Sequence, residues 1–284
     1  MKRLLATAVL LALSVAVFAA TPQRPLAITG QPCPDAPVDQ GTLTPRLARL
    51  LQPGAAQLPP DPAAAARQRQ DAERLATDWA QLCRYAAGNR TLGPPAVGEQ
   101  RIVFMGDSIT EFWKLGDPAL FSAGVIDRGI SGQTTGQMLV RFRQDVIDLH
   151  PIAVHLMAGT NDIAGNSGPT TLATVQGNIQ SMVEMAQAHG ITVILASIPP
   201  AADFPWRPGL QPARTIETLN AWLQGYAAGK GIRYVDYHAV LADGSGGLQK
   251  ALANDGVHPN RDGYGLMKPL AMAAIASARQ DARP

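Results

Sequence analysis

The sequence predicts an α/β fold with a parallel sheet. From Arg101 onward, short apolar runs of strand length alternate with segments whose apolar residues recur at helical spacing. Helices that connect consecutive strands imply parallel pairing with right-handed crossovers. The chain of 284 residues is 46% apolar and 16% charged, which allows a sizeable core. The candidate strands are Ile102–Met105, Val125–Asp127, Ile152–Met157, Ile191–Ser197 and Ile232–Asp236.

The first 20 residues have the pattern of a secretory signal peptide. Lys2 and Arg3 precede an apolar stretch from Leu4 to about Phe18, and Val17 and Ala19 fit a small-x-small cleavage site. A membrane anchor is the alternative, but the stretch is shorter than the roughly 18 apolar residues that span a bilayer. We therefore expect cleavage, no integral membrane association afterwards, and a periplasmic or secreted protein.

Residues 21–100 are expected to form an N-terminal extension, and residues 101–284 the main domain. The extension starts with a Pro-rich arm without its own core, to about residue 60. Asp61–Pro62 then starts one amphipathic helix that ends near Gly88. One face of this helix carries Leu75, Trp79, Leu82 and Ala86.

The chain has two cysteines, Cys33 and Cys83. In an oxidising compartment they could form a disulfide, and free thiols are the alternative. The spacing of the two residues does not decide between these states.

The stretch around Ser108 joins the first candidate strand to a helix. The apolar run stops at Gly106, and Asp107 and Ser108 follow at the start of helical periodicity. A serine in this turn lies beside the unpaired amides of a helix N-terminus, where developing negative charge is stabilised. The alternative is a simple helix cap, and the segment taken alone favours the cap.

Polar residues follow the other strands as well. In parallel sheets, ligands bind beyond the carboxyl ends of the strands. The loop 129–135 follows the second strand, residues 159–162 follow the third, and Asp255 and His258 lie beyond the fifth. Each alone could be a turn or a cap. Together with Ser108 they provide a hydroxyl, a backbone-amide loop, a carboxamide, an imidazole and a carboxylate, which is the set needed for acyl transfer through a serine nucleophile.

Four motifs resemble the conserved blocks of the SGNH hydrolases, also called GDSL esterases/lipases. They are GDS at 106–108, the glycine block ending at Gly132, GTND at 159–162 and DGVHP at 255–259. The resemblance covers Arg101 to the C-terminus. It implies a flavodoxin-like three-layer α/β/α sandwich with a five-stranded parallel sheet, and it implies no metal or other cofactor. It also assigns roles: Ser108 as nucleophile, His258 as base, Asp255 as its orienting partner, and the Ser108 amide, Gly132 amide and Asn161 side chain as the oxyanion hole. Asp127 stands where the family often has Asn.

The same blocks are similar to a bacterial branch near platelet-activating-factor acetylhydrolase and carbohydrate acetylesterases. This resemblance implies short acyl groups, acetyl above all, on a sugar or small alcohol. The alternatives are an O-acetyltransferase acting on glycans with the same site, a longer-chain lipase or lysophospholipase, and a non-catalytic carbohydrate-binding module. The sequence does not identify the physiological ester or the oligomeric state.

Two further observations concern the substrate and partners. Phe204, Trp206 and Arg207 follow the fourth strand, so they could wall a substrate pocket or simply pack within their loop. The net charge is +2 without a Lys/Arg-rich run, which argues against a nucleic-acid partner.

Overall fold

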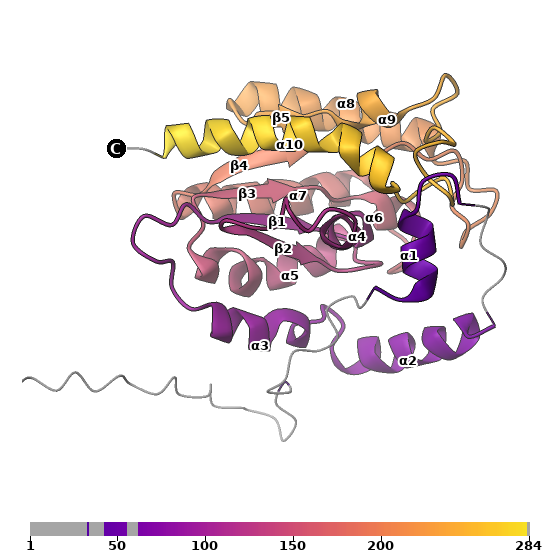
Figure 1. Cartoon of the computed structure of the whole chain (residues 1–284), viewed down its shortest axis with the longest axis horizontal. Helices are drawn as coiled ribbons and strands as arrows, with labels where there is room; N and C mark the ends of the chain where they lie inside the picture. Colours follow the sequence, from indigo (N-terminus) through magenta and orange to yellow (C-terminus); the bar gives the residue numbers. More distant parts are fainter. Residues whose placement is uncertain (1–32, 34–42, 56–61, 283–284) are drawn as a thin grey trace, which may run out of the picture. The chain divides into compact units, whose positions relative to one another are not determined.

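The computed structural model describes residue 33 and residues 43–55 and 62–282. The chain divides into two units, residues 1–33 and 34–284, and only Cys33 of the first is described. The expected signal peptide therefore lies outside the described residues. The second unit contains one parallel sheet with strand order β2-β1-β3-β4-β5, flanked by helices (Figure 1). This is the predicted α/β fold.

The five strands lie where the apolar runs predicted them, within two residues at each end. All four pairings are parallel, and β1 pairs with both β2 and β3. Their bounds are β1 (Ile102–Gly106), β2 (Val125–Gly129), β3 (Ala153–Leu156), β4 (Thr192–Ala196) and β5 (Arg233–Val235).

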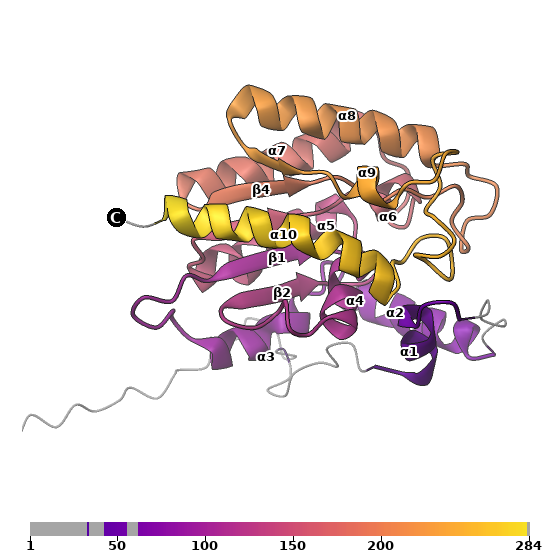
Figure 2. The same cartoon turned by 45° about the horizontal axis from the view of Figure 1, so that its top comes forward.

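Helices connect the strands and form the outer layers, with α10 running along the sheet in Figure 2. The longer ones are α4 (Ser108–Gly116), α5 (Thr135–Asp145), α7 (Leu172–Ala188), α8 (Ala213–Lys230) and α10 (Arg261–Asp281). The short ones are η1 (Ile147–Leu149), α6 (Thr160–Ile163) and α9 (Tyr237–Leu241).

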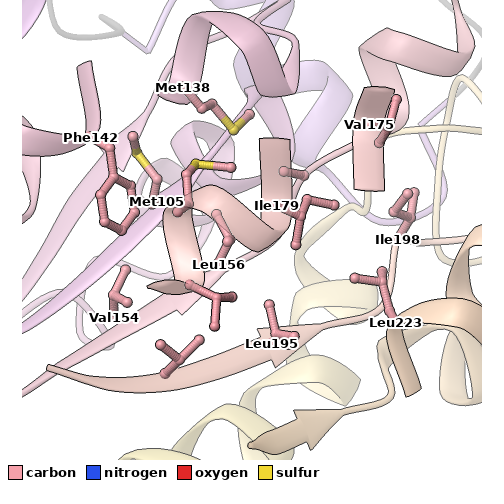
Figure 3. Close-up of a cluster of buried hydrophobic side chains, with 14 of the residues drawn as sticks. Met105, Met138, Phe142, Val154, Leu156, Val175, Ile179, Leu195, Ile198 and Leu223 are labelled. Carbon is pink, nitrogen blue, oxygen red and sulfur yellow. The ribbon is translucent and has the colours of Figure 1, made fainter. Parts of the chain in front are cut away.

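Alternate residues of each strand enter two separate cores. Val103 and Met105 of β1 belong to the cluster that contains α5, α7 and α8, where Met105 lies near Phe142 (Figure 3). Ile102 and Phe104 belong to the cluster formed with α4, α9 and α10. Because both faces of the sheet are covered, β1 and β4 are nearly continuously apolar rather than alternating. The result is a three-layer α/β/α sandwich.

The N-terminal extension differs from the expectation. It contains three helices in its described part, α1 (Pro45–Leu51), α2 (Ala64–Thr77) and α3 (Cys83–Leu92), rather than a coreless arm and one helix. Leu51 of α1 is fully buried in the same core as α4 and α10. Residues 34–284 form a single unit, so the structure places no domain boundary at residue 100.

A break between α2 and α3 explains why the single-helix prediction was wrong. The Asp78 carboxylate accepts hydrogen bonds from the N–H groups of Leu82 and Cys83, at 2.7 and 2.9 Å, and so starts a new helix. Trp79 is 49% exposed and lies between the helices, so the predicted apolar face does not form. Tyr85 is buried instead, and α3 ends at Gly93 rather than Gly88.

Both cysteines are disulfide-bonded, so the oxidised alternative holds and no described cysteine carries a free thiol. Among the helices of the described residues, none has the length and apolar character needed to cross a membrane.

Candidate active site

Ser108 lies at the first turn of α4, directly after β1. Asp107, not Ser108, is the helix cap: its Oδ1 accepts the Ile109 N–H at 2.9 Å. The hydroxyl of Ser108 is therefore available for another partner. Its residue is 9% exposed, so the hydroxyl lies near the surface but within the site. The simple-cap interpretation of Ser108 is not needed to explain how α4 begins.

Asp255 and His258 come from the loop before α10, and the fold brings both to Ser108. The Ser108 Oγ lies 2.9 Å from His258 Nε2. On the other side of the ring, His258 Nδ1 lies 2.7 Å from Asp255 Oδ2. The second oxygen, Asp255 Oδ1, accepts the N–H groups of Val257 and His258 at 3.0 and 2.8 Å. The carboxylate is thus fixed by its own loop and orients the imidazole.

The electrostatics suit this arrangement. Burial pushes the pKa of His258 down, but the charge and hydrogen bond of Asp255 and the charge of Asp107 outweigh it and raise the pKa above its usual value. Burial alone would raise the pKa of Asp255, but the adjacent His258 and the loop hydrogen bonds lower it to about 2. Asp255 therefore stays ionised at neutral pH beside an imidazole that it makes more basic.

Gly132 lies in the loop between β2 and α5, beside the Ser108 turn. Its φ of 80° is in the left-handed region, which favours glycine. In the described part of the chain the N–H groups of Gly132 and Ser108 have no hydrogen-bond acceptor. The loop comes close because Gly129 passes against α4: a Cβ there would lie 2.3 Å from the Glu111 nitrogen.

Asn161, in α6 at the end of β3, joins these two segments. Its Nδ2 donates to the Gln133 carbonyl at 3.0 Å and to Asp107 Oδ2 at 3.2 Å. Its Oδ1 accepts from Asn166 Nδ2 at 2.7 Å. Asp107 is buried, and burial raises the pKa of its carboxyl to about 6. The carboxamide is thus held between the Gly132 loop and the Ser108 turn.

The loop after β4 reaches the site through Trp206. Its ring centroid is 6.2 Å from that of His258, and its Nε1 donates to Asn166 Oδ1 at 3.1 Å. Trp206 and Arg207 are exposed and line a cavity of about 450 Å³ with Pro208, Gly209 and Leu210. Phe204 fits the alternative of packing within the loop, because it is fully buried and stacks on Trp206.

Several site-supporting residues were not predicted from the sequence. Arg141 is fully buried and donates to the Gln133 side chain and to the carbonyls of Gly106 and Arg128. Glu111 accepts from the Ser131 backbone and hydroxyl. Arg141 and Glu111 are charged residues on the buried faces of α5 and α4. A charge at a buried helix position is the only sign of their role that the sequence offers.

Known proteins resemble this chain in architecture and in sequence. The model of the GDSL-like lipase/acylhydrolase family matches residues 104–266. A proposed acylhydrolase of Bacteroides fragilis NCTC 9343 is 46% identical, with 71% of this chain and 98% of that chain covered and a TM-score of 0.69. A GDSL-like lipase of Bacteroides thetaiotaomicron VPI-5482 is 44% identical, with 70% and 98% covered and a TM-score of 0.68.

A more distant relative is the uncharacterized lipoprotein YqeF of Bacillus subtilis (strain 168). It is 33% identical over 82 residues, which are 28% of this chain and 34% of the relative. The match thus spans only about a third of that lipoprotein. The family match extends from β1 into α10 and includes the Ser108 turn and the His258 loop, and the chain therefore belongs to the GDSL-like lipase/acylhydrolase family and is an esterase or acylhydrolase.

Proposed function

We propose that the protein is a serine esterase in which Ser108, His258 and Asp255 form the catalytic triad and short acyl esters are the substrates. The observation that carries this proposal is the continuous hydrogen-bonded chain: 2.9 Å from Ser108 Oγ to His258 Nε2 and 2.7 Å from His258 Nδ1 to Asp255 Oδ2. A serine hydroxyl needs an adjacent base to become nucleophilic, and the base needs a partner that fixes its tautomer.

In the proposed reaction, His258 Nε2 takes the Ser108 proton as Oγ attacks the ester carbonyl carbon. The imidazolium, stabilised by Asp255, then gives this proton to the oxygen of the leaving alcohol, and an acyl-serine remains. Water attacks the acyl-serine with His258 again as base, which releases the acid and restores Ser108. Ser108, His258 and Asp255 thus return to their starting states after each turnover.

The oxyanion of the tetrahedral intermediate would be bound by three donors: the N–H groups of Ser108 and Gly132 and the Nδ2 of Asn161. The two N–H groups have no competing acceptor in the described residues. Asn161 Nδ2 already has two, and its longer bond, 3.2 Å to Asp107, is the one we expect to yield to the oxyanion. Donors fixed beforehand are effective because they need no reorganisation during the reaction.

A short acyl group on a sugar or small alcohol fits the groups beside the serine. Trp206 offers an exposed aromatic face near His258, and Arg207 adds a cation at the same edge. Phe204 supports the Trp206 ring from beneath rather than binding substrate.

An activity panel tests the proposal. p-Nitrophenyl esters from acetate to palmitate and acetylated sugars are assayed with the wild type and with Ser108→Ala. We expect acetate to be preferred and the variant to lose nearly all activity. Palmitate preferred over acetate would refute the short-acyl claim, and an active variant would refute the nucleophile. Products that shift from free acid to acylated glycan when glycan is added would indicate the transferase alternative.

Export is part of the proposal. The N-terminal pattern supports it, as do the disulfide-bonded cysteines, because disulfides persist mainly in oxidising compartments. The lipoprotein relative is compatible with it. N-terminal sequencing of protein recovered from the producing cells should start near residue 20, and an unprocessed cytoplasmic protein would contradict export.

A further inference from the structure

The loop that carries Gly132 is held in place by a segment of the N-terminal extension. This segment is Trp79–Leu92, which comprises α3 and the turn before it, and it lies outside the family match at 104–266. α3 lies along α5 beside the β2 end of the sheet in Figure 1. We call the segment the brace, and its contacts fall on both sides of Gly132.

On the N-terminal side of Gly132, a charged pair reaches the loop. Glu111 of α4 uses one carboxylate oxygen to pair with Arg84 of the brace. The other oxygen accepts the Ser131 N–H at 2.8 Å and the Ser131 hydroxyl at 2.5 Å. The side chains of Arg84 and Glu111 are only 11% and 7% exposed. In such surroundings, removing one partner of an ion pair leaves the other charge uncompensated.

Tyr85, next to Arg84, contacts the start of the same loop. Its hydroxyl donates to the Gly129 carbonyl, and the guanidinium of Arg128 lies 4.6 Å from its ring centroid. Asn89 of α3 accepts from Arg128 as well. The brace therefore fixes the end of β2 from which the loop departs.

On the C-terminal side of Gly132, the brace supplies backbone acceptors. Gln133 Nε2 donates to the Ala80 carbonyl at 2.9 Å, and Gln137 Nε2 donates to the Trp79 carbonyl at 2.7 Å. Gln137 Oε1 in turn accepts the Thr134 N–H at 3.0 Å. The residue before Gly132 and the residue after it are thus both tied to the brace.

We propose that Arg84 is a positioning residue for ester hydrolysis, which acts through Glu111 and Ser131 to hold the Gly132 amide where the oxyanion forms. The inference rests on the proposed oxyanion role of Gly132. Because the contact matters only when the oxyanion develops, its loss should lower kcat and leave KM nearly unchanged.

The test compares Arg84→Ala and Arg84→Lys with the control Arg74→Ala on p-nitrophenyl acetate. Arg74 is an exposed arginine of α2 that pairs with Asp71, so its loss should change neither constant. Complete loss of an oxyanion donor costs about 100–1,000-fold in kcat, so a displaced donor in Arg84→Ala should cost roughly 10–100-fold. Arg84→Lys, which keeps the charge, should recover part of the loss.

A second readout separates positioning from general damage. A short alkylboronic acid forms a tetrahedral adduct with a catalytic serine and mimics the charged intermediate. Its inhibition constant for Arg84→Ala should rise by about the factor by which kcat/KM falls. A folded Arg84→Ala variant with unchanged kcat, or with lower kcat but an unchanged inhibition constant, would overturn the proposal.

Ser131→Ala keeps the test decisive if the Arg84 variants do not fold. It removes one of the two bonds from the loop to Glu111 and leaves the ion pair intact, so we expect a smaller fall in kcat, about three- to tenfold, with KM unchanged. No change in kcat would overturn the proposal. Loss of activity in Ser108→Ala is a separate result, so a failure of the serine mechanism is distinguished from a failure of the brace.

Discussion

Asp127, the central residue of β2, is a buried acid next to the proposed site. Its Oδ1 accepts the Gly129 N–H at 2.8 Å, which shapes the start of the Gly132 loop. Burial, with the nearby Glu111 charge, raises the pKa of its carboxyl to about 7. The hydrogen bond needs only an oxygen acceptor. The negative charge of the buried carboxylate therefore lowers the free energy of unfolding without being needed for this bond. Asn at this position would keep the acceptor without the charge.

Asp127→Asn should therefore stabilise the protein in a pH-dependent way. Between the unfolded pKa of about 3.9 and the folded value of about 7, the folded wild type binds a proton that the unfolded chain releases, so its stability falls as pH rises. The gain of the variant should be absent below about pH 4, grow up to about pH 7 and then level off at a few kcal/mol. Urea titrations at several pH values measure it.

Asp148→Asn is the matched control for this prediction. Asp148 is exposed and lies 3.8 Å from Arg143. Its substitution should therefore not produce a gain in stability that grows between about pH 4 and pH 7. An Asp127→Asn variant that is no more stable than the wild type above pH 7 would show that the buried charge is compensated.

The pH dependence of activity should report the His258–Asp255 pair. His258 must be neutral to act as a base, so activity rises as pH passes its pKa, which Asp255 raises above the usual value of 6.5. Asp255→Asn removes that charge, so the acid limb of kcat/KM should move to lower pH while kcat falls by about a hundredfold or more. Profiles of both proteins measure this. An acid limb that does not move would assign it to another group.

At the scale of elements, the features that depend on the local spacing of apolar residues were predictable from the sequence. The five strands and the faces of α5, α7 and α8 were predictable because the apolar residues of each element enter a core. The break between α2 and α3 was not, because Asp78 accepts the N–H groups of Leu82 and Cys83 through its side chain and Gln81 has a φ of 54°. Neither property is visible in hydrophobic spacing, and the exposed Trp79 happens to complete a helical pattern.

The candidate catalytic residues were predictable for a different reason. Ser108, Asn161 and His258 each follow a strand whose carboxyl end lies at one edge of the sheet, so the topology itself brings them together. Arg84 and Glu111 were not predictable as supports of the Gly132 loop. Their roles depend on where a helix outside the repeating α/β pattern docks, and such docking is set by packing between residues far apart in sequence.

α1 supports the His258 loop as α3 supports the Gly132 loop. Asn254, next to Asp255, has its Nδ2 at 3.1, 2.7 and 2.8 Å from the carbonyl oxygens of Arg49, Leu50 and Gln52, which share its two hydrogens. These carbonyls are at the end of α1, where a helix runs out of its own N–H donors. The Arg49 and Gln52 carbonyls also accept backbone N–H groups, at 3.2 and 3.3 Å. Asn254 thus joins the extension to the loop that carries Asp255 and His258.

We predict that Asn254→Ala lowers the free energy of unfolding by about 1–3 kcal/mol, chiefly because the part-buried Leu50 carbonyl loses its donor. Asn254→Asp, which has the same shape but no donor, should be at least as destabilising. Denaturant melts measure both variants. If Asn254→Asp is as stable as the wild type, the contact between α1 and this loop does not depend on the amide.

At the scale of the whole molecule, residues 34–284 are one unit in which the extension is part of the catalytic domain. The region that matches the family model contains Ser108, Asp255 and His258. α1 contacts the loop that carries Asp255 and His258, and α3 contacts the Gly132 loop through Glu111. Cys83, the first residue of α3 and the neighbour of Arg84 in sequence, is disulfide-bonded. Truncation at residue 100 would therefore remove contacts that the site uses.

The central claim is that Ser108 is the nucleophile of this enzyme. Its most direct test is labelling of the intact protein with a fluorophosphonate, followed by mass spectrometry of the labelled peptide. We predict a single adduct on Ser108 of the wild type, much slower labelling of His258→Ala because the serine loses its base, and none of Ser108→Ala. An adduct on another residue, or labelling of Ser108→Ala at the wild-type rate, would contradict the claim.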